Sequence, residues 1–196
     1  MYGIYVNSTV IAQFVAPISV VSNVPIFVVD ALSLKRNVSK RPAQRWEILS
    51  NLEPLSYDAN KLFSLFVKKG NSETISVTMP QNYGAIKTLT TTGSPTATGT
   101  AGNSSVTVAS NNGTIPEGTF IKFGNHSKIY MLTETLSGNG TMYIFPNLYV
   151  SVSGTGFAYK DNVIMTAFID TDSTTGMVYT DGILMDLGSV KLVESL

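Results

Sequence analysis

The sequence predicts a mainly β protein with one α-helix, and three observations support this fold class. Between residues 116 and 148, apolar and polar residues alternate in three short runs separated by turns, the period of a half-buried antiparallel sheet. Charged residues make up only 13% of the chain, about half the usual share, while Ser, Thr, Asn and Gly are abundant, as in many all-β proteins that assemble. A single segment carries a helical apolar stripe with capping signals at both ends.

The first part of the chain, residues 1–83, contains strand signals and this helix. Residues 26–34, 44–50 and 73–79 are typical of strands, and Pro80 ends the third run. The predicted helix spans 56–69, with Ser56 as N-cap and with two lysines and a glycine at its end. Its apolar stripe consists of Leu55, Ala59, Leu62, Phe63 and Phe66.

The middle part, residues 84–155, begins with a Thr-, Ser- and Gly-rich stretch and continues as a strand meander. The stretch 88–114 allows a flexible loop or weak edge strands, and we expect a partly ordered loop. The meander predicts strands at 119–123, 128–134 and 141–145. Because both faces of these strands carry apolar residues, the sheet should close into a small barrel or meet another protein.

The last part, residues 156–196, again contains strand signals, which lie at 162–169, 177–179, 183–187 and 190–193. An autonomous β unit therefore separates the helix-bearing part from this tail. We expect the tail to return and complete the sheet of the first part, so that 1–83 plus 156–196 form one β domain that carries 84–155 as an inserted β domain.

Charge is unevenly distributed in a chain whose net charge is zero. Residues 35–45 hold five basic residues and no acid, whereas 161–186 hold five acids and no base. Two blocks of opposite charge can form complementary surfaces, either within one subunit or between neighbouring subunits in a closed ring. Two solvated loops of opposite charge are the plainer interpretation. Nucleic-acid binding by the basic block is a weaker interpretation, because only one aromatic residue, a tryptophan next to the block, could stack on bases. The residues that we expect at such a subunit interface are Arg36, Arg41, Arg45, Asp170 and Asp172.

The sequence offers little for catalysis, so we expect no enzyme. The chain has no cysteine and a single histidine, which argues against thiolate chemistry and the usual zinc sites. The chain has no Gly-x-Ser-x-Gly motif that would place a serine nucleophile for a hydrolase triad with His126. We expect His126 to make a local hydrogen bond in a turn. We therefore predict no catalytic residue, no metal and no cofactor. No basic signal-peptide region is visible and polar residues interrupt every apolar run before about 18 residues, so we expect no membrane partner.

Several segments resemble, in the same order, a phage distal tail protein of the T-five type, from phages with long non-contractile tails. The segments that carry the resemblance are Gln44-Arg-Trp46, the predicted helix, Met79-Pro-Gln81, Gly118-Thr-Phe-Ile-Lys-Phe123, His126-Ser-Lys-Ile-Tyr130, Pro146-Asn-Leu148 and Glu194-Ser-Leu196. The resemblance implies a tail-tube-like β-barrel or sandwich domain with one helix, carrying an inserted small barrel like those that bind oligosaccharides or oligonucleotides.

The resemblance also implies a function. Six copies would form a ring in the virion, between the tail-tube protein and the tail-tip hub protein, with a channel through which DNA passes without specific binding. Such a protein is made and assembled in the cytoplasm of the bacterial host.

Two other functions stay open at this point. A carbohydrate-binding or adhesive module of a tail tip could use exposed aromatic residues of the meander, namely Tyr130, Tyr143 and Tyr149. Against it, the chain has one tryptophan, Trp46, for which a core position is the better prediction. A ring protein of the tail tube or of the head-tail junction would place the same demands on fold and self-association, and would differ only in its position.

Overall fold

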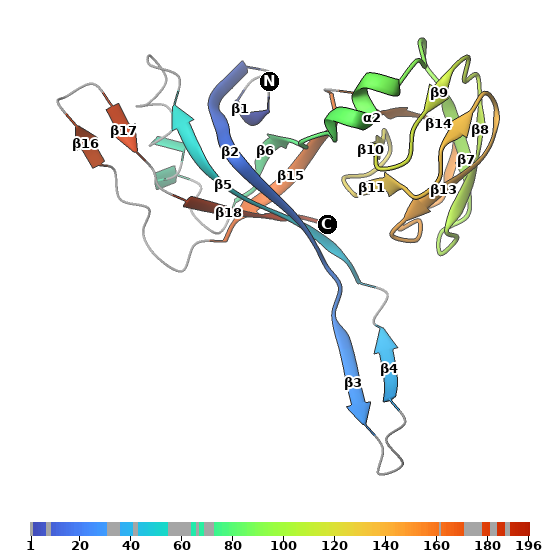
Figure 1. Ribbon diagram of the computed structural model, residues 1–196, viewed down its shortest axis with the longest axis horizontal. Helices are drawn as coiled ribbons and strands as arrows, with labels where there is room; N and C mark the ends of the chain where they lie inside the picture. The colour runs from blue at the N-terminus through green and yellow to red at the C-terminus, as the bar shows by residue number, and fades with distance from the viewer. Residues whose placement is uncertain are drawn as a thin grey trace.

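Two closed β-barrels lie side by side, and a two-stranded arm projects from one of them (Figure 1). The computed structural model describes residues 2–6, 9–30, 36–40, 43–54, 64–65, 67–68, 73–160, 162–170, 178–180, 184–186 and 189–196. Strands make up 56% of the structure and helices 6%, so the predicted mainly β fold is confirmed.

The first barrel has the strand order β1-β2-β5-β18-β15-β6, and every neighbouring pair is antiparallel. Alternate residues point inwards, so that Ile4, Ile48, Val77 and Leu192 are fully buried and form its core. The strands are β1 (Gly3–Val6), β2 (Thr9–Asn23), β5 (Arg45–Pro54), β6 (Ile75–Thr78), β15 (Ile164–Ile169) and β18 (Ser189–Glu194).

The strands β2 and β5 are long enough to leave the barrel and lead into the arm. Their register shifts between Val15 and Ser19, where Pro17 has no backbone N–H for the ladder. Beyond Asn23 the chain continues as β3 (Ile26–Asp30) and returns as β4 (Arg36–Lys40); we call this pair of strands the arm.

The second barrel has the strand order β10-β11-β13-β8-β7-β14. Its core contains fully buried side chains from the meander, among them Ile121, Phe123, Tyr130 and Met142. The three predicted meander strands are confirmed as β10 (Phe120–Phe123), β11 (Ile129–Leu132) and β13 (Gly140–Phe145). The remaining strands are β7 (Thr96–Gly99), β8 (Ser105–Ala109) and β14 (Val152–Ala158), together with a small pair, β9 (Thr114–Ile115) and β12 (Leu136–Ser137).

The expectation of a partly ordered loop over 88–114 is wrong. The stretch supplies β7 and β8, two of the six strands of the second barrel. Ala97, Val106 and Val108 point inwards and are at most 2% exposed, while the threonines and serines between them face outwards. The small apolar side chains therefore decide the structure, although polar residues dominate the composition.

Two crossings connect the barrels. The first runs from β6 to β7 and contains α2 (Tyr83–Thr88), a helix that the sequence did not predict; its N-cap Asn82 accepts a hydrogen bond from Gly84 N. The second leads from β14 to β15. The second barrel thus uses strands between 96 and 158, and the first uses strands before 79 and after 163, while the domain division itself stays a prediction.

Two parts of the predicted organisation lie partly outside the described residues. Of the helix predicted at 56–69, residues 64, 65, 67 and 68 are described and are helical. In the tail, β16 (Val178–Thr180) and β17 (Leu184–Asp186) form an antiparallel pair that overlaps the strand segments predicted at 177–179 and 183–187.

Candidate functional site at the barrel junction and the arm

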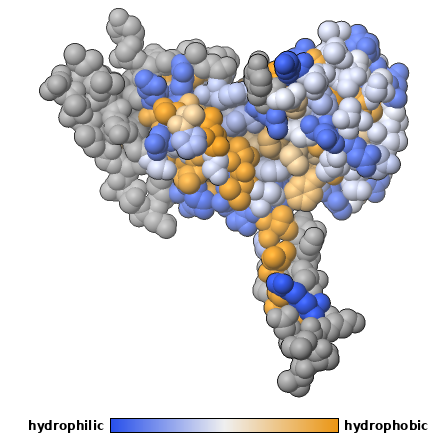
Figure 2. Space-filling view, in the orientation of Figure 1, coloured by the Kyte–Doolittle hydropathy of each residue, from blue (hydrophilic) through white to orange (hydrophobic). Residues whose placement is uncertain are grey.

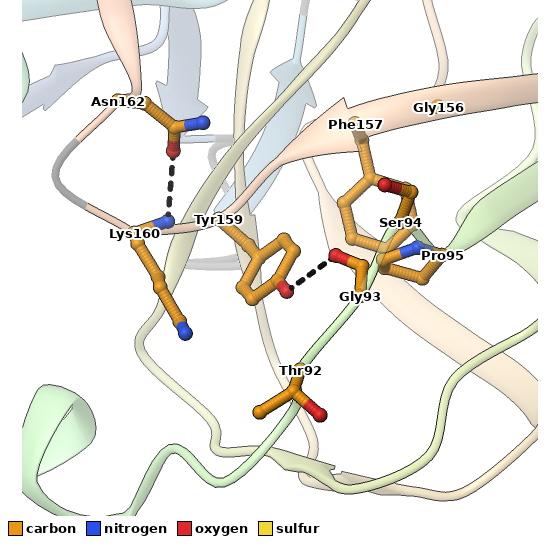
Figure 3. A pocket seen from close by; sticks show the side chains of 9 residues that line it. All are labelled: Thr92, Gly93, Ser94, Pro95, Gly156, Phe157, Tyr159, Lys160 and Asn162. Carbon is orange, nitrogen blue, oxygen red and sulfur yellow. Dashed lines mark hydrogen bonds between the residues drawn. The ribbon is translucent and has the colours of Figure 1, made fainter.

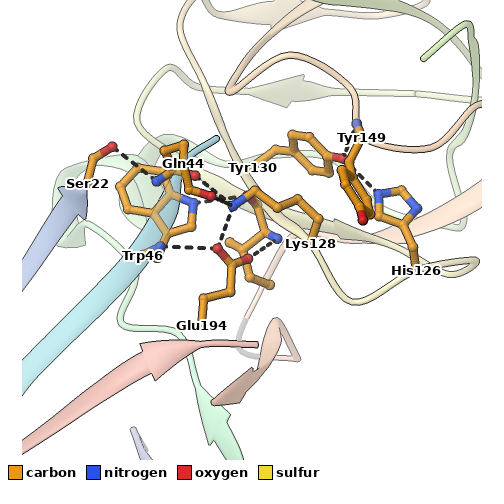
Figure 4. A network of polar contacts seen from close by, with 9 residues as sticks. Ser22, Gln44, Trp46, His126, Lys128, Tyr130, Tyr149 and Glu194 are labelled. Atoms are coloured by element: carbon orange, nitrogen blue, oxygen red, sulfur yellow. Dashed lines mark hydrogen bonds and ion pairs between the residues drawn. The ribbon is translucent and has the colours of Figure 1, made fainter. Parts of the chain in front are cut away.

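A buried ion pair joins the two barrels. Lys128 precedes β11 of the second barrel, and Glu194 ends β18 of the first. The Lys128 Nζ lies 2.5 Å from Glu194 Oε2, and the two side chains are 3% and 0% exposed (Figure 4). Burial lowers the pKa of Lys128, and the neighbouring Glu194 carboxylate opposes this change.

Further hydrogen bonds satisfy both members of this pair. Lys128 Nζ also donates to the Gln44 backbone oxygen at 2.7 Å and to Gln44 Oε1 at 2.6 Å. Glu194 accepts from Ile129 N at 2.7 Å and from Trp46 N at 3.1 Å. All three ammonium hydrogens and both carboxylate oxygens therefore have partners, as a buried pair requires to offset its desolvation.

Aromatic and amide contacts surround the ion pair and cross the same junction. The Trp46 ring of the first barrel packs edge-on against Phe120 and Phe145 of the second, with centroids 5.0 and 6.2 Å apart. Trp46 Nε1 donates to Ile129 O at 2.9 Å, and the Trp46 side chain is 3% exposed, so its predicted core position is confirmed. Gln81 also bridges, because its amide donates to Phe120 O and accepts from Phe120 N.

Sequence reasoning missed this junction as a site. Lys128 is 84 residues from Gln44 and 66 from Glu194, so no local spacing links them. The available signal was that each belongs to a segment that carries the family resemblance, and these segments meet here. The junction is structural, and it fixes how the barrels sit on one another.

His126 lies in the turn between β10 and β11, where both of its ring nitrogens are bonded. Nδ1 donates to Asn125 Oδ1 at 2.7 Å, as the predicted local hydrogen bond requires, and Nε2 accepts from the Tyr130 hydroxyl at 2.8 Å. That hydroxyl accepts in turn from Tyr149 N at 2.9 Å. Burial, followed by the positive charge of Lys122, lowers the pKa of His126, and burial raises the pKa of Tyr130 to about 12.

The meander aromatics proposed for an adhesive module differ in exposure. Tyr130 is fully buried, so the expectation that it is exposed is wrong: its ring packs against Phe123 in the second barrel. Tyr143 and Tyr149 are 42% and 60% exposed.

The structure describes three of the five residues predicted at a subunit interface, two on the arm or at its base and one on the first barrel. Arg36 begins β4 on the arm and Arg45 begins β5 at its base, and both are exposed. Asp170 follows β15 on the barrel and binds Lys191 of its own chain at 2.9 Å, which also reaches Glu47 at 3.4 Å. Arg41 and Asp172 lie outside the described residues, and the interface stays a prediction.

The arm exposes apolar side chains along its length. Ile26 is 55% exposed, Val28 37% and Val29 64%, and Val21 at the base is 47% exposed. Figure 2 shows apolar residues following one another from the barrel onto the arm. Such a run on a thin two-stranded ribbon has no core of its own to cover it.

Within the described ranges, no group of three or more His, Cys, Asp or Glu side chains is arranged to hold a metal ion. In the same part of the chain, no helix combines the length and apolar character needed to cross a membrane. Comparison with known protein families and with curated proteins gives no match to this chain.

Proposed function

We propose that this protein is a structural component of a phage tail, of which six copies form a ring at the distal end. The ring joins the tail-tube protein to the tail-tip hub protein and leaves a channel for DNA. In this proposal the chain performs no bond-making chemistry, and its function is the shape of its surfaces when copies lie side by side.

The observation that carries the proposal is the arm. An isolated two-stranded hairpin is marginally stable in water, and this one exposes Ile26, Val28 and Val29. Burying these side chains against a neighbouring copy would remove them from water, at about 25 cal/mol for each Å² of apolar surface. The exposed arm therefore favours a function in which neighbouring copies cover its apolar side chains in an assembly.

The two barrels restrict how copies can meet. Their strands have partners on both sides because each barrel is closed, whereas β3 and β4 of the arm have one strand partner each among the described strands. The two edges of the arm are different, so a contact of the β3 edge of one copy with the β4 edge of the next would be head-to-tail, the kind that generates a ring when the rotation closes. The exposed Arg36 and Arg45 would lie in or beside this contact.

The resemblance to phage distal tail proteins supplies the place of the ring in the virion. Its segments are distributed over both barrels, and three of them meet at the Lys128–Glu194 junction. The similarity therefore falls on residues that hold the fold together. A ring protein of the tail tube or head-tail junction has the same geometry and differs only in position.

Native mass spectrometry and electron microscopy of the purified protein test the proposal. We expect rings of the wild-type protein and monomers of Val29→Asp, because the new carboxylate would be buried against the neighbouring copy. The matched control is Val150→Asp, which changes a valine that is 38% exposed on the second barrel, and this variant should still form rings. Wild-type monomers at all concentrations, or unchanged rings of Val29→Asp, would contradict the proposal.

A second candidate, an adhesive module, is favoured by the exposure of Tyr143 and Tyr149 on the second barrel. Exposed tyrosine rings can pack against sugar rings. A monomer that binds neutral glycans and loses them in Tyr149→Ala would favour this function over the ring.

A further inference from the structure

A pocket opens beside the two crossings that connect the barrels. Residues 92–95 follow α2 on the way into the second barrel, and the described residues 156–160 and 162 belong to the end of β14 and the return crossing. The pocket has a volume of about 570 Å³, in the range of small-molecule sites. The residues that line it are Thr92, Gly93, Ser94, Pro95, Gly156, Phe157, Tyr159, Lys160 and Asn162 (Figure 3).

Two aromatic rings form the apolar part of this pocket. Phe157 and Tyr159 pack edge-on with their centroids 5.9 Å apart, and each is 8% exposed. The Tyr159 hydroxyl donates to Gly93 O at 3.1 Å, which fixes the ring across the pocket. The hydrogen bond and the ring contact therefore hold the apolar wall of the pocket in place.

The polar part of the pocket supplies hydrogen-bond donors. Lys160 Nζ lies 5.6 Å from the centroid of the Tyr159 ring and forms no ion pair with any described residue. Thr92 Oγ1 accepts from Asn112 Nδ2 at 2.9 Å, which leaves its own hydrogen free to donate. Asn162 Oδ1 accepts from Lys160 N at 3.3 Å, so its NH₂ group also remains available.

The charge of the described lining has one sign. The nine lining residues include one lysine and no acid, and their free polar hydrogens belong to an ammonium, hydroxyls and an amide. Charge-assisted hydrogen bonds from an ammonium to a carboxylate or phosphate are about twice as strong as neutral ones. The complementary ligand is therefore an anion that also offers neutral oxygen acceptors.

We infer that this pocket binds a small acidic sugar, that is, a monosaccharide or disaccharide that carries a carboxylate or a phosphate. Its anionic group meets Lys160, its hydroxyl oxygens accept from Thr92 and Asn162, and an apolar face of its ring lies against Phe157 and Tyr159. This inference concerns the second barrel and its crossings alone, and it holds whether or not the arm assembles copies into a ring.

Calorimetric titration of the full chain tests the inference, with glucuronate, glucose 6-phosphate and glucose as ligands. We expect saturable binding of one or both anionic sugars and at least about tenfold weaker binding of glucose, because the neutral sugar lacks the contact to Lys160. The comparison between the two anions shows whether the pocket takes a carboxylate or a phosphate.

Two variants locate the binding. Lys160→Gln should weaken binding of the anionic sugar about tenfold or more. Lys87→Gln removes the same charge from an exposed lysine in the last turn of α2, outside the pocket lining, and should leave binding unchanged. Circular dichroism shows whether each variant remains folded. Absence of saturable binding to either anion, glucose binding as tight as theirs, or equal loss in both variants would overturn the inference.

Discussion

At the scale of single residues, Thr78 is a buried hydroxyl without a hydrogen-bond partner. Its side chain is fully buried in the first barrel, and Oγ1 has no partner among the described residues. Replacing it by the isosteric valine removes an unsatisfied polar atom and keeps the volume. We expect Thr78→Val to leave the free energy of unfolding unchanged or to raise it by about 1 kcal/mol, as measured by urea denaturation.

Thr119 provides the matched control for this prediction. It is also buried, but its Oγ1 donates to Pro116 O at 2.7 Å. Thr119→Val removes this hydrogen bond, leaves the Pro116 carbonyl without that donor, and should lower the free energy of unfolding by about 1 kcal/mol. Equal destabilisation in both variants would contradict the interpretation of Thr78.

His126 should make the stability of the second barrel depend on pH. Its pKa in the folded protein lies below the ordinary value of 6.5, so the unfolded chain binds a proton at higher pH than the folded one. The contribution of neutral His126 is complete above pH 6.5 and is lost as the pH falls from there through the folded pKa. Protonation also places a second donor on the Tyr130 hydroxyl, which already accepts from Tyr149 N.

The measurement is thermal unfolding across this pH window for the wild type and for His126→Asn. The wild type should lose stability on acidification more steeply than the variant, which lacks the titrating ring. The chain has one histidine, so a difference in slope near pH 6.5 is assigned to this residue. Parallel curves for the two proteins would contradict the prediction.

At the scale of secondary-structure elements, the sequence correctly predicted those strands in which one face carries large apolar residues. β10, β11 and β13 fit this pattern, and Phe123, Ile129 and Met142 are fully buried in the structure. The pattern was misleading at β7 and β8, where small inward residues are separated by threonine and serine. There barrel closure, a non-local effect, selects strands that local composition does not reveal.

The arm shows a second limit of sequence patterns. The sequence predicted a strand over 26–34, and β3 confirms it for Ile26–Asp30, while 31–34 lie outside the described residues. However, periodicity describes only a strand and its faces, and it cannot indicate whether the strand lies in a barrel or projects from it. That outcome depends on the length of β2 and β5, whose pairing continues from Ala12↔Pro54 to Asn23↔Arg45.

At the scale of the whole molecule, the junction between the barrels depends on residues that only the completed fold brings together. Gln44, Lys128 and Glu194 come from three distant segments, so their contact could not be predicted from spacing. The opposite charge blocks, by contrast, were visible in the sequence, but Asp170 already has Lys191 as a partner within its own chain. Charge patterns identify candidate surfaces, and geometry decides which charges remain available.

The junction should make the two barrels unfold together. Trp46, Gln81 and the Lys128–Glu194 pair all cross it, so separating the barrels exposes an aromatic cluster and two charges at once. We expect one calorimetric transition for the wild type. Lys128→Met leaves Glu194 buried without its counter-charge and should destabilise the protein by about 3–5 kcal/mol, with the transition broadening or dividing in two.

A double variant separates the charge pair from the shape of the junction. Lys128→Met with Glu194→Leu replaces both charges by apolar side chains of similar size. It should recover part of the stability because no uncompensated charge remains, while the Ile129 and Trp46 N–H groups lose their acceptor. Lys191→Met, which removes a half-exposed lysine from the surface pair with Asp170 and Glu47, should leave a single transition near the wild-type temperature. If Lys128→Met also unfolded in one unshifted transition, the ion pair would not couple the barrels, and the aromatic contacts of Trp46 would have to do so alone.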